Sequence, residues 1–425
     1  MGDSPLVPVS KIADIVLGGT PKRSEEAYWG GSIKWASAKD ITSVNTRYIY
    51  DTEERITETG LEESNTKLLP KDTIVITARG TVGAMAMLSE DMAFNQSCYG
   101  LISKDGIDSD YLFYALKASL SKISSVSYGT VFDTITMKSF DSIEIPVPSI
   151  EEQKRIAHIL GTLDDKIELN QRMNETLEAI ARAIFKSWFV DFDPVKAKMA
   201  GESYPLPDEI MALFPDELVE SELGLIPKGW EVGKLEDLAE KVENGGTPKK
   251  SEPLFWTKGD IPWLTSGEVR QNLISSTDNF ITELGLKNSS AKIWGPGTTI
   301  VALYGATAGE VTMSNIKLTA NQACCGLSPK ENCQYYLYLT ASRATDLLAN
   351  QARGSAQQNL SQGIVKNFKC IIPSPDTLIK FKNLINPIYE KISIILEEIA
   401  ILIKLRDTLL ENLISEKNKF WSKDE

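Results

Sequence analysis

The feature that most constrains the fold is a long heptad pattern in the middle of the chain. Between residues 151 and 194 the steps between seam positions alternate between four and three, which is the a/d spacing of a coiled coil. The seam positions are 156, 160, 163, 167, 170, 174, 177, 181, 184 and 188. Eight are apolar; the other two, Asn170 and Asn174, are expected to hold the register at some cost in stability. A helix this long spans roughly 60 Å, and so narrow a seam requires a partner helix.

The C-terminal part of the chain carries a matching pattern. From Leu378 to Leu413 the seam again steps by three and four, and Arg406 is its only polar member. Pro387 is expected to kink this helix or delay its first turns, because proline lacks a backbone donor. Two interpretations stay open: each helix packs on its own domain, or the two helices pair with each other. We favour the pair.

Composition and charge bound the class of protein. The 425 residues leave room for about three domains, and 42% hydrophobic with 24% charged residues is typical of globular chains. The most apolar run, residues 392–405, is interrupted by Glu397, Glu398 and Lys404 and cannot span a bilayer. Five cysteines supply no disulfide or zinc framework, and the N-terminus lacks a secretory signal pattern. We therefore expect a cytoplasmic protein with no membrane partner.

The net charge of −13 argues against a protein that coats nucleic acid without sequence preference. It is compatible with a site-specific DNA reader that has local basic loops. Such a reader would bind weakly alone and need a partner with a positive surface.

Residues 11–148 and 234–375 carry the same plan twice. The motif GGTPK at 18–22 returns at 245–249, and NQSCYGL at 95–101 returns 226 residues later as NQACCGL at 321–327. Two tryptophans downstream of each GGTPK motif also match: Trp29 and Trp35 with Trp256 and Trp263. Order, spacing and identity agree over both segments, which predicts an internal repeat.

Within each copy, strand and helix patterns are mixed. Residues 72–88 and 298–313 predict a strand, a glycine-rich turn and a second strand, whereas 109–123 and 333–351 predict helices. The predicted fold class is α+β: two similar mixed α/β domains separated by an antiparallel two-helix coiled coil, with a pseudo-twofold internal repeat. The predicted division is 1–150, first domain; 151–193, first long helix; 194–230, connector; 231–375, second domain; and 376–425, second long helix. Five prolines deny the connector a long helix, its middle (208–223) could form one short helix, and its length suits a tether.

Motifs for catalysis are missing. There is no phosphate-binding P-loop, no Gly-x-Gly-x-x-Gly after a strand and no Asn/Asp-Pro-Pro-aromatic tetrapeptide of an adenine methyltransferase. The single histidine, His158, excludes His-based triads and metal hydrolysis, so no catalytic residue and no metal site are predicted. Asp164 and Asp165, adjacent in mid-helix, are interpreted as solvated surface. The pattern is typical of a binding protein.

The loops that could contact DNA are paired across the repeat, and their frame residues match while their other residues differ. Arg79, in a turn, could read guanine bidentately, which its counterpart Tyr304 cannot do, and Gln357 and Gln358 could read adenine. Solvated surface is the simpler interpretation of each single cation, and the domain core that of the tryptophans. The DNA-binding candidates are Thr20, Lys22, Arg23, Lys34, Lys39, Arg79 and Thr81 in the first copy, and Thr247, Lys249, Lys250, Lys258, Arg270, Tyr304, Arg353, Gln357 and Gln358 in the second.

The chain resembles the DNA-specificity (S) subunits of type I restriction-modification systems over essentially its whole length. The marks are FKSWFVDFDP at 185–194, LIPKGWEV at 225–232, IPVPSIEEQKRI at 145–156 and the two GGTPK loops with their tryptophans. The resemblance implies two target-recognition domains, each reading half of a bipartite asymmetric site in double-stranded DNA, held apart by an antiparallel coiled coil. It also implies two modification (methyltransferase) subunits and restriction (endonuclease and translocase) subunits as partners. S-adenosylmethionine, ATP and Mg would bind those partners, so no cofactor is expected in this chain. The second copy, IPSPDTLIKF, lacks the Glu-Gln pair of the first, so the two docking ends are not expected to be equivalent.

One aromatic run has two interpretations. It either docks a partner subunit or fills the junction with the neighbouring domain, because one seam position cannot bury so many rings. The docking candidates are Phe185, Trp188, Phe189 and Phe192.

Two other classes of protein are alternatives. A repeat-built scaffold or carbohydrate-binding protein would use the tryptophan loops on sugars, and its binding would hardly depend on salt, whereas DNA binding falls steeply with salt. A self-contained methyltransferase or nuclease is disfavoured by the missing motifs.

Overall fold

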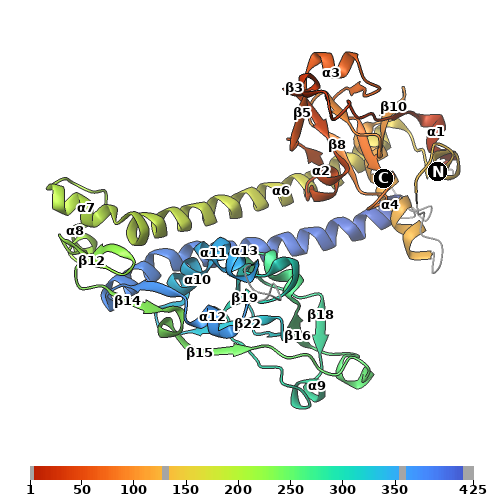
Figure 1. The fold of residues 1–425 in the computed structure, drawn as a ribbon. Helices are drawn as coiled ribbons and strands as arrows, with labels where there is room; N and C mark the ends of the chain where they lie inside the picture. The colour runs from red at the N-terminus through yellow and green to blue at the C-terminus, as the bar shows by residue number, and fades with distance from the viewer. Residues whose placement is uncertain (1–3, 127–133, 354–359, 415–425) are drawn as a thin grey trace, which may run out of the picture. The chain divides into compact units, whose positions relative to one another are not determined.

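The computed structural model describes residues 4–126, 134–353 and 360–414 (Figure 1). The chain forms two compact units. The first unit comprises residues 1–171 and 399–425, and the second comprises 172–398. Each unit contains one α+β head and a part of both long helices. We call residues 4–149 the first head and residues 231–374 the second head.

The first head is built on two sheets and a strand pair. Short, nearly continuous apolar runs form the central strands, which are buried on both faces. The five-stranded sheet has the order β2 (Ala13–Leu17), β10 (Cys98–Ser103), β7 (Ile74–Thr77), β8 (Met85–Leu88) and β4 (Tyr48–Ile49). The four-stranded sheet has the order β5 (Glu54–Ile56), β3 (Trp29–Ala36), β9 (Met92–Phe94) and β6 (Leu68–Leu69), and β1 (Leu6–Pro8) pairs with β11 (Glu144–Pro146). The helices are α1 (Val9–Ile12), η1 (Glu26–Tyr28), α2 (Ala38–Ser43), α3 (Glu58–Glu62), α4 (Ser109–Val126) and α5 (Ser139–Ser142).

The second head repeats this strand order except at β6, which confirms the internal repeat. Its five-stranded sheet has the order β15 (Ala239–Asn244), β22 (Cys324–Pro329), β19 (Thr299–Ala302), β20 (Val311–Ser314) and β17 (Leu273–Ile274). The second sheet has the order β18 (Asn279–Ile281), β16 (Ile261–Leu264) and β21 (Thr319–Ala320), and β14 (Glu231–Lys234) pairs with β23 (Lys369–Ile372). The counterpart of β6 is a single bridge between Trp294 and Leu318. The helices are η3 (Leu235–Leu238), η4 (Pro253–Phe255), η5 (Ser266–Arg270), α9 (Glu283–Lys287), η6 (Gly305–Thr307), α10 (Gln334–Arg343), α11 (Thr345–Arg353) and α12 (Gln362–Lys366).

The two long helices are α6 (Ile150–Lys186) and α13 (Pro375–Ile414), and they pair in antiparallel fashion inside each unit (Figure 1). In the first unit Asp164 of α6 forms an ion pair with Arg406 of α13. In the second unit the ring of Trp188, just beyond α6, lies 5.9 Å from that of Phe381 in α13. Every predicted seam position on both helices is buried or partly buried. The pairing interpretation is therefore confirmed, although both helices also pack on the heads.

Two details of the seam differ from expectation. Pro387 lies inside α13, which begins at Pro375, so it does not delay the start of the helix. Asn170 and Asn174 are buried as predicted, but the amide groups of both have no hydrogen-bond partner among the described residues. No asparagine pair supports the register, and the buried amides carry a desolvation cost instead.

The connector between α6 and the second head is folded against the second unit rather than acting as a tether. After a π-helical turn (Ser187–Asp191), Phe192 adopts a left-handed conformation with φ 56°, and α7 (Asp193–Ala200) begins with Pro194 in its first turn. Val195, Phe214 and Trp230 are buried in the core of the second unit. The other connector elements are α8 (Asp208–Met211), β12 (Leu218–Ser221) and β13 (Gly224–Pro227).

The cysteine side chains, all within the described residues, form no disulfide bond. All five cysteines are free and buried, and burial raises the pKa of the Cys370 thiol to about 12. Among the helices of residues 4–126, 134–353 and 360–414, none combines the length and the apolar character needed to cross a membrane.

Candidate nucleic-acid interface

The two GGTPK loops are seated in the same way on the two heads. A Cβ atom at Gly19 would lie 2.3 Å from the backbone nitrogen of Thr66, and one at Gly246 would lie 2.4 Å from that of Ala291. The preceding glycines leave equally little room, because Gly18 lies on the carbonyl of Asn95 and its counterpart Gly245 on that of Asn321. The repeated Gly-Gly pair is therefore a requirement of close backbone approach.

The tryptophans fasten these loops. The indole N–H of Trp35 donates to the carbonyl of Gly19 (3.0 Å), and that of Trp263 donates to the carbonyl of Gly246 (3.0 Å). In the same way, Trp29 donates to Lys22 (3.3 Å) and Trp256 to Lys249 (3.2 Å).

The ring pairs are edge-to-face, with centroids 5.2 Å apart for Trp29–Trp35 and 4.9 Å for Trp256–Trp263. Trp35 is only 1% exposed and Trp263 only 4%. The two inner tryptophans are therefore core residues and cannot stack on a sugar, which weighs against the carbohydrate-binding alternative.

The candidate cations of the first head other than Arg79 are all paired with carboxylates. The guanidinium of Arg23 donates to both carboxylate oxygens of Glu54, with Nη2 to Oε2 at 2.8 Å, and Lys34 forms an ion pair with Glu90. Two further pairs complete the set: Lys22 with Glu25 at 2.9 Å, and Lys39 with Glu53 at 2.7 Å. These side chains therefore present little net positive charge to a phosphate.

Arg79 is the exception in the first head. It lies at the tip of the turn between β7 and β8, where Gly80 and Gly83 have positive φ and the backbone N–H of Ala84 donates to the Thr77 hydroxyl (3.0 Å). Arg79 and Thr81 are both exposed. Within the described part of the chain, the Arg79 guanidinium has no carboxylate or hydrogen-bond partner, so its donors are available to a ligand.

The second head leaves most of its candidate cations unpaired. Lys249 forms an ion pair with Glu252 (3.1 Å), in the manner of Lys22 and Glu25. Lys250, Lys258 and Arg270 are exposed and have no carboxylate partner among residues 4–126, 134–353 and 360–414.

The remaining candidates of the second head are spread over several elements. The hydroxyl of Thr247 donates to the side chain of Gln322, and Tyr304 is 37% exposed. Arg353 ends α11, and Gln357 and Gln358 lie outside the described residues. Thr20, the counterpart of Thr247, is partly buried.

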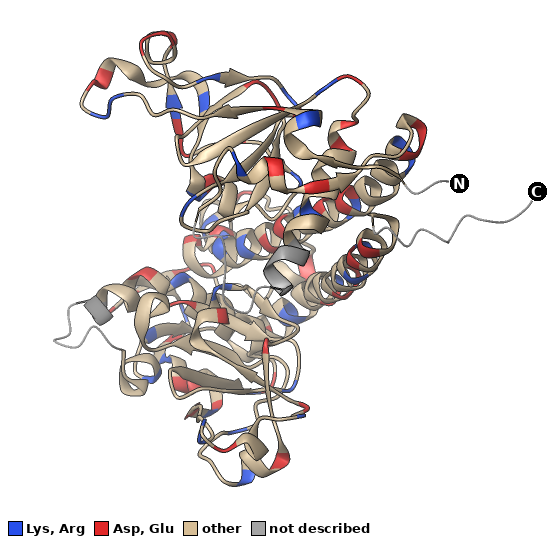
Figure 2. Cartoon of the chain, turned by 90° about the vertical axis from the view of Figure 1, so that its right-hand side faces the viewer, with Lys and Arg blue, Asp and Glu red and all other residues tan. Residues whose placement is uncertain are grey.

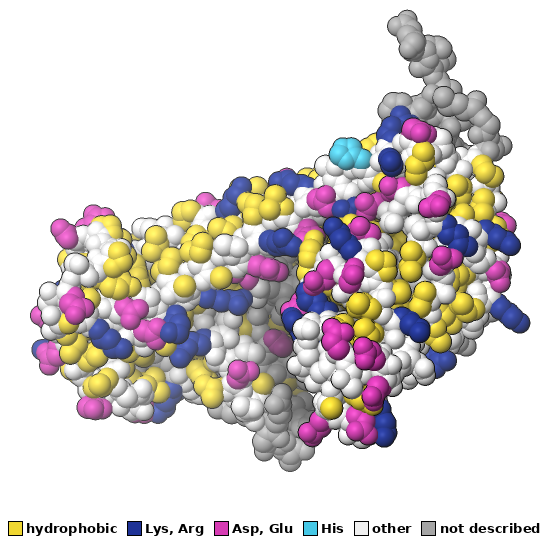
Figure 3. Space-filling view, turned by 90° about the horizontal axis from the view of Figure 1, so that it is seen from above, with side chains coloured by type: hydrophobic (Ala, Val, Ile, Leu, Met, Phe, Trp, Pro, Cys, Tyr) yellow, Lys and Arg dark blue, Asp and Glu magenta, His cyan; other side chains and the backbone are white. Residues whose placement is uncertain are grey.

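Neither figure of charge shows a large area of one sign. In Figure 2, basic and acidic residues alternate along the loops, and in Figure 3 dark blue and magenta side chains are intermixed on the face shown. On the face shown in Figure 3, the basic side chains are therefore separate positions rather than a continuous basic patch.

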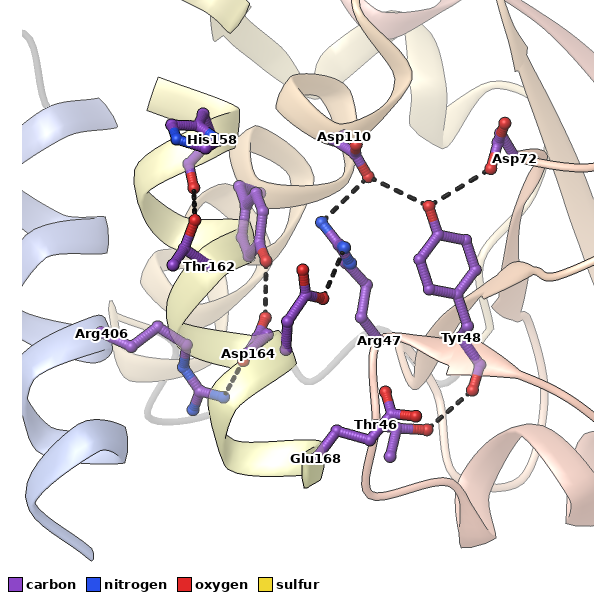
Figure 4. Close-up of polar contacts among 12 residues, drawn as sticks. Thr46, Arg47, Tyr48, Asp72, Asp110, His158, Thr162, Asp164, Glu168 and Arg406 are labelled. Atoms are coloured by element: carbon purple, nitrogen blue, oxygen red, sulfur yellow. Dashed lines mark hydrogen bonds and ion pairs between the residues drawn. The ribbon is translucent and has the colours of Figure 1, made fainter. Parts of the chain in front are cut away.

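Figure 4 shows a buried polar network where the first head meets the two long helices. The site residues predicted from the sequence do not include it. Asp164 is 8% exposed, accepts a hydrogen bond from the hydroxyl of Tyr114 (2.6 Å) and pairs with Arg406 (2.7 Å). The interpretation of Asp164 as solvated surface is therefore wrong, although Asp165 is exposed as expected. The available signal was Arg406, the one polar residue in its seam, which required a buried anion.

Arg47 connects the same network to the head. Its guanidinium pairs with Asp110 of α4 (3.1 Å) and Asp165 of α6 (2.9 Å). A Cβ atom at Gly161 would lie 2.6 Å from the Arg47 Nη1 atom, so a glycine on α6 allows this approach. Burial raises the pKa of the Asp110 carboxyl, and the neighbouring Arg47 opposes that shift. The contacts are structural: they hold the head on the helices.

The aromatic run at the end of α6 lies in the core of the second unit. Phe185, Trp188, Phe189 and Phe192 are all buried. The centroid of the Phe189 ring lies 4.8 Å from those of both Tyr336 and Phe381. The contacts agree with the interpretation in which these rings fill the junction with the neighbouring domain, and they leave no exposed aromatic surface there for a partner.

Comparison with known proteins adds a family. A model of the type I restriction modification DNA specificity domain matches residues 5–179 and 227–413. The type I restriction enzyme MjaIX specificity subunit of Methanocaldococcus jannaschii is 31% identical over 412 residues, which cover 96% of this chain and 91% of that protein. The HindI specificity subunit of Haemophilus influenzae is 32% identical over 338 residues, covering 69% and 73%.

A solved structure has the same fold. The S subunit of a type I restriction-modification system from M. genitalium superimposes with a TM-score of 0.55 at 16% identity, and the alignment covers 98% of this chain and 97% of that chain. At that identity the likeness concerns the fold alone.

Proposed function

The chain belongs to the family of type I restriction-modification DNA specificity subunits, and from this premise we propose that it selects the DNA site of such a complex. In this proposal each head reads one half of a bipartite asymmetric site. The proposal assigns the chain no catalytic role, in keeping with its family relatives, which are named as specificity subunits rather than as methyltransferases or nucleases.

The observation that carries the proposal is the contrast between frame and loops in the two heads. Both heads share a strand order, a Gly-Gly pair that allows close backbone approach, and an indole hydrogen bond to that pair. In contrast, the residue equivalent to Arg79 in the second head is Tyr304, and the residue equivalent to Arg23 is Lys250. Two readers of different base sequences need this combination, because phosphate contacts position a protein on DNA while varied base contacts specify the sequence.

The long helices are proposed to set the distance between the two half-sites. Each of them has residues in both units and pairs with the other inside each unit. A paired helix is stiff and rises about 1.5 Å per residue, so the unread gap in the DNA would have one fixed length.

The partners are proposed on the same premise. Two modification subunits and the restriction subunits would supply S-adenosylmethionine, ATP and Mg binding together with the chemistry. The net charge of −13 supports a need for partners with positive surfaces, because this chain alone would be repelled by the DNA backbone.

Methylome sequencing tests the proposal directly. A host that carries the complete system should show adenine methylation at a bipartite motif with a fixed gap, and deletion of this gene alone should abolish it. Unchanged methylation after the deletion would refute the proposed function.

An insertion in α6 tests the spacer. Lengthening the helix after Asn170 by a few residues should change the gap in the methylated motif and leave both half-sites as they were. A change in either half-site would contradict the role of the helices as a spacer.

A further inference from the structure

Arg23 is held on three sides in the first head. Its guanidinium donates to both carboxylate oxygens of Glu54, which lies 31 residues further along the chain on β5. The guanidinium carbon lies 4.1 Å from the centroid of the Trp29 ring and 5.2 Å from that of Trp35. Those rings are themselves fixed by hydrogen bonds to the loop backbone. The side chain is nevertheless 56% exposed, so it is an ordered arginine at the surface.

The second head lacks this arrangement at the same place. Glu54 faces Trp35 across the sheet as Asn279 faces Trp263. A hydrogen bond also shows that positions 54 and 279 are equivalent. The Thr52 hydroxyl donates to the carbonyl of residue 54 (2.7 Å), and the Thr277 hydroxyl donates to that of residue 279 (2.8 Å).

The counterpart of Arg23 is Lys250, which follows the same GGTPK motif and has no carboxylate partner in the described part of the chain. Conservation of the frame therefore does not require an arginine–glutamate pair at this position, and the pair is specific to the first head.

The chemistry of the pair restricts what it can recognise. A guanidinium has five N–H donors in one plane, and a bidentate carboxylate uses two of them. The other three point away from Glu54 and include a parallel pair on a free edge of the group. The carboxylate cancels the positive charge, which makes Arg23 a poor phosphate contact but leaves the directional donors intact.

Ordering adds a second effect. A free arginine side chain loses up to about 2 kcal/mol of rotamer entropy when a ligand fixes it, and this is a fold-change of about 30 in affinity. Glu54 and Trp29 impose that order before any ligand arrives. A preorganised, charge-neutralised donor pair suits a base edge with two adjacent acceptors, and in the major groove guanine presents O6 and N7 in that way.

We propose that Arg23 reads a guanine in the half-site of the first head and that Glu54 is the residue that positions it. The inference rests on the proposed function and deepens it, because it names one base contact and the side chain behind it. The competing interpretation is an ordinary surface ion pair that only fastens the loop, and such pairs contribute little to stability.

The test compares two carboxylates of the same head. Glu54→Gln removes the carboxylate charge that positions Arg23, and Glu25→Gln removes the carboxylate that pairs with Lys22 in the same loop. Both variants change the net charge by the same amount. Each full-length variant, and Arg23→Lys, is co-expressed with the modification subunits, and methylated motifs are read by sequencing the host DNA.

The expected result is a position-specific change. Arg23→Lys and Glu54→Gln should relax the same single guanine position in one half-site, while Glu25→Gln leaves the motif unchanged. With the assembled complex and a duplex of the wild-type motif, affinity should fall about 5- to 150-fold for Arg23→Lys and up to about 30-fold for Glu54→Gln. Glu25→Gln should stay within about twofold of the wild type.

Three results would overturn the inference. One is an unchanged motif in both Arg23→Lys and Glu54→Gln. Another is equal loss at every position of both half-sites, which would make the pair a fastener of the loop. The third is an equal increase in DNA affinity in Glu54→Gln and Glu25→Gln, which would show that Glu54 acts only through its negative charge. A wild-type host without any gene-dependent bipartite motif would instead refute the proposed function itself.

Discussion

The two heads have the same frame, made by equivalent residues, but they differ in whether their basic side chains are paired with carboxylates. Gly19 and Gly246, and Trp35 and Trp263, make equivalent contacts to within a few tenths of an ångström. In the first head, however, the cations near these contacts are paired with carboxylates, while Lys250 in the second is unpaired among the described residues. The frame is constrained by backbone approach and buried donors, whereas exposed side chains can change without affecting it.

The attachment of each head to the helices differs as well. The first head is attached through polar contacts, in which Asp164 joins Tyr114 and Arg406. The corresponding part of the second unit has more aromatic contacts: the rings of Tyr335 and Tyr389 are stacked with centroids 4.7 Å apart, and the Tyr335 hydroxyl also donates to the Asn386 side chain (2.7 Å). One topology therefore tolerates different contacts between a head and the helices on which it packs.

The largest effect is expected when the inner tryptophan of each head is removed, which tests whether the two frames are equivalent. Trp35→Ala and Trp263→Ala should each destabilise their own head by about 3–5 kcal/mol, because a large buried ring and its hydrogen bond are lost together. Hydrogen–deuterium exchange, followed head by head, measures this. If one variant left its head as protected as the wild type, the two frames would not be equivalent.

The polar junction provides the next largest effect. Asp164→Ala should destabilise the first unit by about 2–3 kcal/mol, since it leaves the buried Tyr114 hydroxyl and part of Arg406 without their acceptor. Asp165→Ala, one residue along the same helix, is the matched control and should cost at most about 1 kcal/mol, because that carboxylate is exposed and its partner Arg47 keeps the ion pair with Asp110. Chemical denaturation monitored by exchange in α4 would compare the two variants, and equal costs would contradict the assignment of Asp164 to the core.

Arg79 and its equivalent Tyr304 allow the two heads to be compared in their contacts with DNA. If Arg79 reads a base, Arg79→Ala should cost about 1–3 kcal/mol in binding by the assembled complex and relax one half-site only. The control is Tyr304→Ala at the matched turn, whose effect should be confined to the other half-site. Equal weakening on all sequences by Arg79→Ala would assign it to the phosphate backbone.

The smallest expected effect concerns the unpaired lysine of the second head. Lys250→Ala should weaken binding of the complex about equally on all sequences and reduce the slope of log affinity against log salt by about 1, because one phosphate contact is lost. Lys22→Ala in the first head, where Glu25 already neutralises the charge, should leave the slope nearly unchanged. A change of motif in Lys250→Ala would show base recognition instead.

Much of the architecture was predictable because it depends on local patterns. The seam of α6 and α13, the repeated strands around the glycine-rich turns and the α+β class all follow from the spacing of apolar residues. The candidate site was only partly predictable. Arg23 and Lys250 were both predicted as basic candidates for DNA contact, but the sequence around Arg23 does not indicate that it pairs with Glu54. In the same way, the burial of Asp164 depends on Arg406, which lies 242 residues away.

From the order of residues alone we could infer that this chain contains one fold twice, and that its two long helices are expected to pair, since repetition and periodicity are visible in the sequence. Only the tertiary structure decided which charges are cancelled, that the aromatic run of α6 lies inside the second unit, and that the connector is part of that unit's core. Those outcomes depend on contacts between distant segments. The free energy of burying a ring or pairing a charge is set by neighbours that the linear order of residues does not reveal.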